Sequence, residues 1–197
     1  IAFLGGAYDP YGMHHLRIAE AIAASGIVTE VRVWPCGPRP DKPNLTSSYH
    51  RGQMTLLGTE IVVGNVVVDL SDVKDGVYRR NHEIQTLLEP EGVIYHTVGA
   101  DWLAGGARGE SLIQKIWIHG KELWKSARFL VLTRPGYELL QEDLPPNSEV
   151  LHLDISGMST EIRERMKRGE SIADLVHPLV LGYILRNGLY LPEKEMT

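Results

Sequence analysis

The 197-residue chain has the length of one α/β domain, carries a net charge of −5 at pH 7, and is 43% hydrophobic and 23% charged. This charge balance argues against a nucleic acid duplex as partner but is compatible with a small phosphorylated ligand. Cys36 is the single cysteine, which rules out an intrachain disulfide and favours a reducing compartment. Because the sequence shows neither an apolar run of membrane-spanning length nor a secretory signal, we expect a cytoplasmic protein with no membrane partner.

Strand-like and helix-like patterns alternate along the chain. Short apolar runs bounded by glycine or proline predict strands at 1–4, 29–34, 66–70, 93–98, 129–132 and 149–153. Helical spacing of apolar residues predicts helices at about 14–25, 48–57, 84–88, 111–126, 160–168 and 177–187. Glu30 and Arg32 interrupt the second apolar run, so we expect that strand nearer an edge of the sheet.

This alternation predicts an α/β fold with a Rossmann-like, doubly wound parallel sheet of five or six strands. The continuous apolar runs at 1–4 and 129–132 are typical of strands that helices cover on both faces. We expect a single domain over residues 1–197, with a small C-terminal helical part at about 157–197.

A glycine turn and two histidines follow the first strand, in the stretch Gly5-Gly6-Ala7-Tyr8-Asp9-Pro10-Tyr11-Gly12-Met13-His14-His15. Ligands of parallel sheets bind where strands end, glycines let the backbone approach a phosphate, and a helix start offers N–H groups. His14 and His15 can donate hydrogen bonds to phosphate oxygens. The fingerprint G-x-G-x-x-G is absent, which disfavours a dinucleotide-dependent oxidoreductase, while a plain turn with two solvent-facing histidines stays open.

A second candidate anion site lies near the C-terminus. Ser159 and Thr160 open a predicted helix, with Ser159 as its expected N-cap, and Arg163 follows within the first turn. Hydroxyl groups and the N–H groups of a helix start can bind a phosphate, and a guanidinium can add a bidentate contact. An ordinary capped helix explains the same residues equally well.

The segment from Gly5 to Leu16 resembles the H-x-G-H signature of the nucleotidyltransferase superfamily. In nicotinate or nicotinamide mononucleotide adenylyltransferases this signature usually reads G-G-x-F-D-P-x-H-x-G-H-L, and the matching residues are Gly5, Gly6, Asp9, Pro10, His15 and Leu16. Gly12 stands where the family has its first histidine, and His14 stands where it has the motif glycine. We therefore hypothesise that His14 supplies the missing imidazole from a shifted position.

The resemblance extends along nearly the whole chain. Residues 156–163 resemble the family's I-S-S-T-x-I-R segment, which matches at Ser159, Thr160, Ile162 and Arg163. Residues 134–136 resemble its R-P-G segment, and 177–190 resemble its last helix. The family's S-Y-T-x-D-T-L segment falls on 77–83, where only Tyr78 clearly matches.

This resemblance implies adenylyl transfer from ATP to nicotinate or nicotinamide mononucleotide, with release of pyrophosphate, in NAD biosynthesis. It implies Mg²⁺ bound through substrate phosphates, with no protein metal site, and catalytic roles for His15, Lys42 and Arg163. The ATP-binding residues it implies are Gly5, Gly6, Ala7, His14, His15, Gly99, Asp101, Ser159, Thr160 and Arg163. The acceptor-binding residues it implies are Asp9, Lys42, Arg51, Tyr78, Trp117 and Arg134. A homo-oligomer is compatible with the sequence.

Several alternatives stay open from the sequence. The enzyme could use another phosphorylated acceptor or CTP, or the chain could be a non-catalytic nucleotide-binding module. Arg79 and Arg80 could bind a more anionic acceptor, although we favour a solvated helix face. Arg51 could pair with a carboxylate, Asp101 could cap a helix, and the remaining histidines at 50, 96, 119 and 152 show no metal-ligand spacing and are expected to be structural.

Overall fold

The structure is a computed structural model that describes residues 1–60, 62, 64–133 and 136–191. Within these residues a single sheet of six parallel strands has the order β3-β2-β1-β4-β5-β6. The strands are β1 (Ala2–Gly6), β2 (Val31–Pro35), β3 (Val66–Val68), β4 (Tyr95–Gly99), β5 (Arg128–Leu132) and β6 (Ser148–Leu151). The strand order reverses between β1 and β4, which is where ligands bind in doubly wound folds. The predicted fold class is confirmed.

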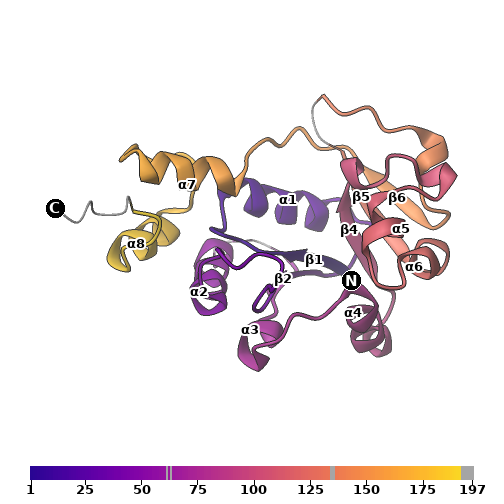
Figure 1. Ribbon diagram of the computed structural model, residues 1–197, viewed down its shortest axis with the longest axis horizontal. Coiled ribbons are helices and arrows are strands. Elements are labelled where there is room, and N and C mark those ends of the chain that lie inside the picture. The colour runs from indigo at the N-terminus through magenta and orange to yellow at the C-terminus, as the bar shows by residue number, and fades with distance from the viewer. Residues whose placement is uncertain (61, 63, 134–135, 192–197) are drawn as a thin grey trace.

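Helices cover both faces of this sheet. They are α1 (Met13–Ala24), α2 (Ser48–Thr59), α3 (Ser71–Asp75), α4 (Asn81–Leu88), α5 (Leu112–Ile116), α6 (Gly120–Ser126), α7 (Ser159–Lys167) and α8 (Pro178–Arg186). In Figure 1, α1 lies on one side of β1 and β2, whereas α3 and α4 lie on the other, and α7 and α8 extend beyond the sheet. None of the helices in the described part of the chain is long and apolar enough to cross a membrane.

The C-terminal helices share the main hydrophobic core with the sheet. Leu16 of α1 and Val33 of β2 belong to the same buried cluster as Ile162 of α7 and Val180 of α8. Burying one such side chain stabilises a fold by roughly 1.5–3 kcal/mol, so this shared core fixes α7 and α8 against the first half of the chain.

The single helix predicted for 111–126 is wrong, because the chain turns between α5 and α6. His119 adopts a left-handed conformation with a φ of 57°, and a Cβ atom on Gly120 would lie 2.0 Å from the carbonyl oxygen of Ile113. The turn therefore requires the close backbone approach that glycine allows. As a result Trp117 and Trp124 do not share one helix face: Trp124 is buried in the core, and Trp117 is half-buried.

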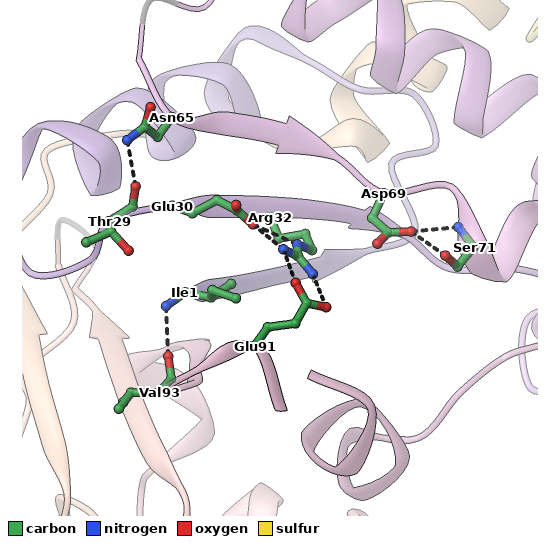
Figure 2. A network of polar contacts seen from close by, with 9 residues as sticks. All are labelled: Ile1, Thr29, Glu30, Arg32, Asn65, Asp69, Ser71, Glu91 and Val93. Atoms are coloured by element: carbon green, nitrogen blue, oxygen red, sulfur yellow. Dashed lines mark hydrogen bonds and ion pairs between the residues drawn. The ribbon is translucent and has the colours of Figure 1, made fainter. Parts of the chain in front are cut away.

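The strand that carries Arg32, expected nearer an edge of the sheet, lies directly beside the edge strand β3. Arg32 donates to Glu30 through Nε at 2.8 Å and to Glu91 through Nη1 at 2.9 Å (Figure 2). Because a buried charge is stable only when it is paired, these two carboxylates allow a cation in an interior strand.

Candidate active site

A cavity of about 340 Å³ lies at the carboxyl edge of the sheet, where β1 and β4 end. Ligand-binding cavities of small-molecule enzymes begin at about this size. Of the residues predicted from sequence, Gly5, Gly6, His15, Tyr78, Gly99 and Trp117 line it. The structure thus brings residues from five separate segments of the chain to one place.

Gly5 and Gly6 shape the cavity wall by making room for aromatic rings. A Cβ atom on Gly5 would lie 2.6 Å from Cζ of Phe3, and one on Gly6 would lie 2.7 Å from Cζ of Tyr8. Phe3 and Tyr8 both line the cavity. The glycines are therefore required by the protein's own packing, besides the close phosphate approach that the sequence suggests.

His15 is held in one orientation at the start of α1. The backbone N–H of Gly12 donates to Nδ1 of His15 at 3.0 Å, and the ring of Tyr8 lies edge-on at 4.9 Å. Since Nδ1 accepts this hydrogen bond, the neutral imidazole carries its proton on Nε2. A ring in this tautomer, on the cavity wall, is a hydrogen-bond donor suited to an anion.

The imidazole of His14 fills a slot between two glycines. A Cβ atom on Gly12 would lie 2.8 Å from both Cε1 and Nδ1 of His14, and one on Gly157 would lie 2.8 Å from Cβ of His14. The rings of His14 and His15 are 3.8 Å apart. His14 thus occupies the space beside Gly12 that a side chain at position 12 would need, which supports the hypothesis of a shifted imidazole.

The second predicted anion site meets the first at the turn after β1, and Figure 1 shows α7 beside α1. Arg163 donates from Nη1 to the carbonyl oxygen of Asp9 at 2.6 Å and from Nη2 to the hydroxyl of Thr160 at 3.0 Å. The hydroxyl of Ser159 donates to the carbonyl oxygen of Pro10 at 2.9 Å. Ser159 is the first residue of α7 rather than its N-cap, which is Met158. Both partners of Arg163 are uncharged, so its positive charge is not neutralised by them.

Comparison with known proteins decides the family. A protein of Leifsonia xyli named "Probable nicotinate-nucleotide adenylyltransferase" is 32% identical over 199 residues, which cover 96% of this chain and 93% of the relative. One of the same name from Tropheryma whipplei is 30% identical over 195 residues, covering 95% of this chain and 97% of the relative. The chain belongs to the nicotinate-nucleotide adenylyltransferase family. It is therefore related to enzymes that transfer nucleotidyl groups. A scan against protein-family models found no match.

Solved structures agree with the fold of this adenylyltransferase family. The structure named "Plasmodium falciparum nicotinic acid mononucleotide adenylyltransferase complexed with NaAD" matches with a TM-score of 0.78 at 21% identity, covering 96% of each chain. The same enzyme complexed with APC matches with a TM-score of 0.73 at 20% identity and the same coverage. At this level of identity the likeness shows a shared fold.

The structure places Arg51, which the sequence predicts to bind the acceptor, in the interior of the fold. This adenylyltransferase buries Arg51 to 1% exposure, and its guanidinium donates to the carbonyl oxygens of Ala7 at 2.6 Å, Gly37 at 2.7 Å and Thr46 at 2.9 Å. These partners are backbone carbonyl oxygens and not the carboxylate considered as the alternative. Arg51 ties two loops together, the turn after β1 at Ala7 and the segment between β2 and α2 at Gly37 and Thr46, and it is not among the residues that line the cavity.

Asp9, also predicted to bind the acceptor, uses its carboxylate within the protein. The side chain is buried, its Oδ1 accepts from the phenol of Tyr190 at 2.5 Å, and its Oδ2 accepts from the N–H of Thr46 at 3.4 Å. Asp9 does not line the cavity. The Asp9 carboxylate thus holds the turn after β1 in place.

Arginines surround Tyr78 at the cavity, among them Arg79 and Arg80, whose role the sequence left open. The guanidinium groups of Arg39 and Arg80 lie 4.5 and 4.6 Å from the ring centre of Tyr78. Arg79 lines the cavity and pairs with Asp72 at 2.8 Å and with an exposed aspartate, Asp75, at 2.6 Å. Since α4 begins at Asn81, Arg79 and Arg80 precede the helix, and the predicted solvated helix face is wrong.

The remaining predicted residues lie outside the cavity lining. Lys42 and Asp101 are exposed, and Ala7 contributes its carbonyl oxygen to Arg51. Arg134 lies outside the described residues.

Sequence reasoning missed part of the cavity floor. Trp34 of β2, His96 of β4 and Trp102 line the cavity, and His96 had been expected to be merely structural. Burial lowers the pKa of His96 to about 4, and its Nε2 lies 2.9 Å from Oε1 of Gln85. A histidine within an otherwise apolar strand pattern was the signal, because it interrupts the run at 93–98.

Proposed function

We propose that the chain transfers the adenylyl group of ATP to nicotinate mononucleotide, or to nicotinamide mononucleotide, and releases pyrophosphate in NAD biosynthesis. The observation that carries this proposal is the convergence of two helix starts on one turn. That turn brings His14 and His15 of α1 next to the α7 residues Ser159 and Arg163, at the side of a cavity with aromatic walls. The names of the curated relatives support the same reaction.

The proposed reaction needs no protein nucleophile. An oxygen of the acceptor phosphate attacks the α-phosphorus of ATP in line, and the bond from that phosphorus to the bridging oxygen of pyrophosphate breaks. The protein contributes by positioning two anions and by stabilising the charge that develops between them. His15, with its proton on Nε2, would donate to an oxygen of the transferring phosphate.

The leaving pyrophosphate would lie against the start of α7. The hydroxyls of Ser159 and Thr160, the N–H groups of the first helical turn and the guanidinium of Arg163 are all suited to bind it. Arg163 is held by a carbonyl and a hydroxyl, so its charge can act on the phosphate rather than on a neighbouring carboxylate.

The acceptor would occupy the aromatic part of the cavity. The rings of Trp102 and Trp117 lie 6.2 Å apart, centre to centre, and Tyr78 lines the same cavity. Flat rings of this kind can pack against a pyridine. Lys42 and Asp101, both exposed close to cavity-lining residues in sequence, remain proposed contacts to phosphate and ribose.

The hydroxyl, guanidinium and backbone N–H donors around the turn suit phosphate oxygens, and the imidazole nitrogens beside them are not the oxygen ligands that Mg²⁺ prefers. In the part of the chain that the structure describes, no cluster of three or more His, Cys, Asp or Glu side chains could hold a metal. Mg²⁺ therefore fits this site as an ion carried by the triphosphate, where it would screen the charge of the phosphate oxygens.

The test is pyrophosphate release by the purified protein with ATP or CTP, each combined with nicotinate mononucleotide, nicotinamide mononucleotide or a pentose phosphate that lacks the pyridine. We expect turnover with ATP and a pyridine mononucleotide only. Turnover with CTP or without the pyridine would replace the proposed substrates, and triphosphate binding without turnover in any combination would refute the proposed catalysis.

A further inference from the structure

The segment after α8 returns to the turn that carries the active-site helix. Tyr190 donates its phenol proton to Oδ1 of Asp9 at 2.5 Å, although the two residues are 181 positions apart in the sequence. Burial, together with the nearby Asp9 carboxylate, raises the pKa of Tyr190, so the phenol remains a hydrogen-bond donor at physiological pH. The second carboxylate oxygen of Asp9 has a weaker partner, the N–H of Thr46 at 3.4 Å.

The backbone of Tyr190 is strained where it makes this contact. Its φ is 60°, in the left-handed region that residues with a Cβ atom rarely adopt. Such conformations persist when surrounding interactions hold them in place. The bond to Asp9 is an interaction of this kind, because it fixes the side chain that follows from the strained backbone.

Asp9 also accepts a hydrogen bond from Arg163, the arginine of the proposed pyrophosphate site. Its carbonyl oxygen accepts from Nη1 of Arg163 at 2.6 Å, and the next carbonyl, of Pro10, accepts from Ser159 at 2.9 Å. A displacement of the Asp9 backbone would therefore move both of these α7 contacts relative to His15. Neither Asp9 nor Tyr190 lines the cavity, so both act on the site from outside it.

We propose that Tyr190 and Asp9 form a positioning clasp for the transfer reaction. By holding the Asp9 carboxylate, Tyr190 fixes the carbonyl that orients Arg163, and so aligns the pyrophosphate-binding side of the site with His15. This inference rests on the proposed function for the identity of the anion, but the clasp itself predicts a binding property that does not require turnover.

The chain offers a matched pair of variants to test the clasp. Tyr190→Phe removes the hydroxyl that reaches Asp9. Tyr183→Phe removes a hydroxyl of α8 that lies 2.8 Å from Nδ1 of His50, so it also breaks one hydrogen bond between the C-terminal part and the rest of the fold. The two variants lose the same chemical group, but only the first is connected to Arg163.

The readout is the Kd of inorganic pyrophosphate and of nicotinate mononucleotide, measured by calorimetry, together with kcat where turnover is found. We expect Tyr190→Phe to raise the Kd of pyrophosphate about tenfold and to lower kcat by a similar factor, because small misplacements of catalytic groups have effects of this order. The Kd of nicotinate mononucleotide should stay unchanged, and Tyr183→Phe should change none of these values. Loss of folded protein alone lowers the number of sites without altering a Kd.

Equal pyrophosphate affinities in the two variants would overturn the clasp. If Tyr190→Phe fails to fold, Asp9→Asn replaces it, since the amide keeps an oxygen for the phenol but weakens the charge-assisted bond. Asp9→Asn should raise the Kd of pyrophosphate by a smaller factor than Tyr190→Phe and leave the Kd of nicotinate mononucleotide unchanged. A pyrophosphate Kd equal to that of Tyr183→Phe would again overturn the clasp. If the wild type binds pyrophosphate but turns over no acceptor, the proposed function fails while this comparison still decides the clasp.

Discussion

At the amino edge of the sheet Arg32 is paired with two carboxylates, whereas at the carboxyl edge Arg163 is held by a carbonyl and a hydroxyl beside a cavity. Figure 2 shows the amino edge, where Asn65 donates to the carbonyl of Thr29 and the main-chain nitrogen of Ile1 donates to that of Val93. Polar groups there satisfy one another. At the carboxyl edge Arg39 and Arg79 of the cavity lining also pair with aspartates, but the hydrogen-bond partners of Arg163 are uncharged, which suits that cation to binding an external anion.

The direction of the helices explains why the two edges differ. Each helix that follows a parallel strand starts near the carboxyl edge, so the positive end of α1 lies beside the cavity that its residue His15 lines. The start of α7 meets the turn before α1 through Ser159. The amino edge lies at the opposite end of the strands, and there Arg32 is paired with Glu30 and Glu91. Substitutions at five positions of the two edges and of the cavity between them test this difference.

His15→Ala should have the largest effect. Removing the oriented Nε2 donor is expected to lower kcat about 100- to 1,000-fold, the loss typical of one donor to a developing anion. Pyrophosphate release under saturating ATP and acceptor measures it. His152→Ala, an exposed histidine outside the cavity lining, is the control and should keep wild-type turnover. Similar kcat values for the two variants would remove His15 from the mechanism.

His96→Phe tests whether the buried part of the cavity lining at β4 is shielded from water. In the unfolded chain the imidazole of His96 is protonated below its usual pKa of 6.5. In the folded protein burial lowers the pKa of His96 to about 4, so the ring stays neutral down to that pH. Stability is therefore lost as pH falls from 6.5 to 4, by about 3 kcal/mol in total. Urea unfolding at pH 7, 5.5 and 4 should show this component in the wild type and in His152→Phe but not in His96→Phe. Parallel pH curves would show that the floor is hydrated.

Exchanging positions 12 and 14 tests the slot between the glycines. His14→Gly should lower kcat about tenfold by removing one imidazole. Gly12→His alone should lower it further, because the new side chain would collide with His14 and Ile162. The double variant Gly12→His/His14→Gly should be more active than either single variant, since one imidazole then occupies the slot. Additive losses in the four-way comparison of kcat would contradict this exchange.

Glu91→Gln should have the smallest effect. It removes one of the two carboxylates of Arg32 at the amino edge, and Glu30 remains as a partner. We expect a slight drop in Tm, because Glu91 is about half exposed and Glu30 still pairs with the buried Arg32, and an unchanged kcat, because this edge has no role in the proposed reaction. A kcat reduced to the level of the His14→Gly variant would show that the two edges are coupled.

The fold, and the part of the site formed by the turn after β1, were predictable because residues close together in the sequence determine them. Alternating apolar runs gave the parallel sheet, and the glycine turn with His14 and His15 is contiguous in sequence. The family resemblance assigned that turn and Arg163 to the same ATP, and in the structure Arg163 donates to the carbonyl oxygen of Asp9 in the turn.

What sequence reasoning missed depends on contacts between distant residues. Arg51 looks like a surface cation until its three carbonyl partners bury it. The break between α5 and α6 arises from the approach of Gly120 to Ile113, which helical periodicity does not record. Trp34 and His96 reach the cavity from strands on either side of β1, and residue spacing along the chain does not show which strands are neighbours.

The shared core of the C-terminal helices has a consequence for synthesis on the ribosome. The nascent chain emerges with β1, the glycine turn and both active-site histidines first, but Ser159, Arg163 and Tyr190 follow only near the end. The turn therefore waits for almost the entire chain before its partners arrive. A chain stalled before residue 159 would hold half of a polyphosphate site and expose the apolar face that α7 and α8 normally cover.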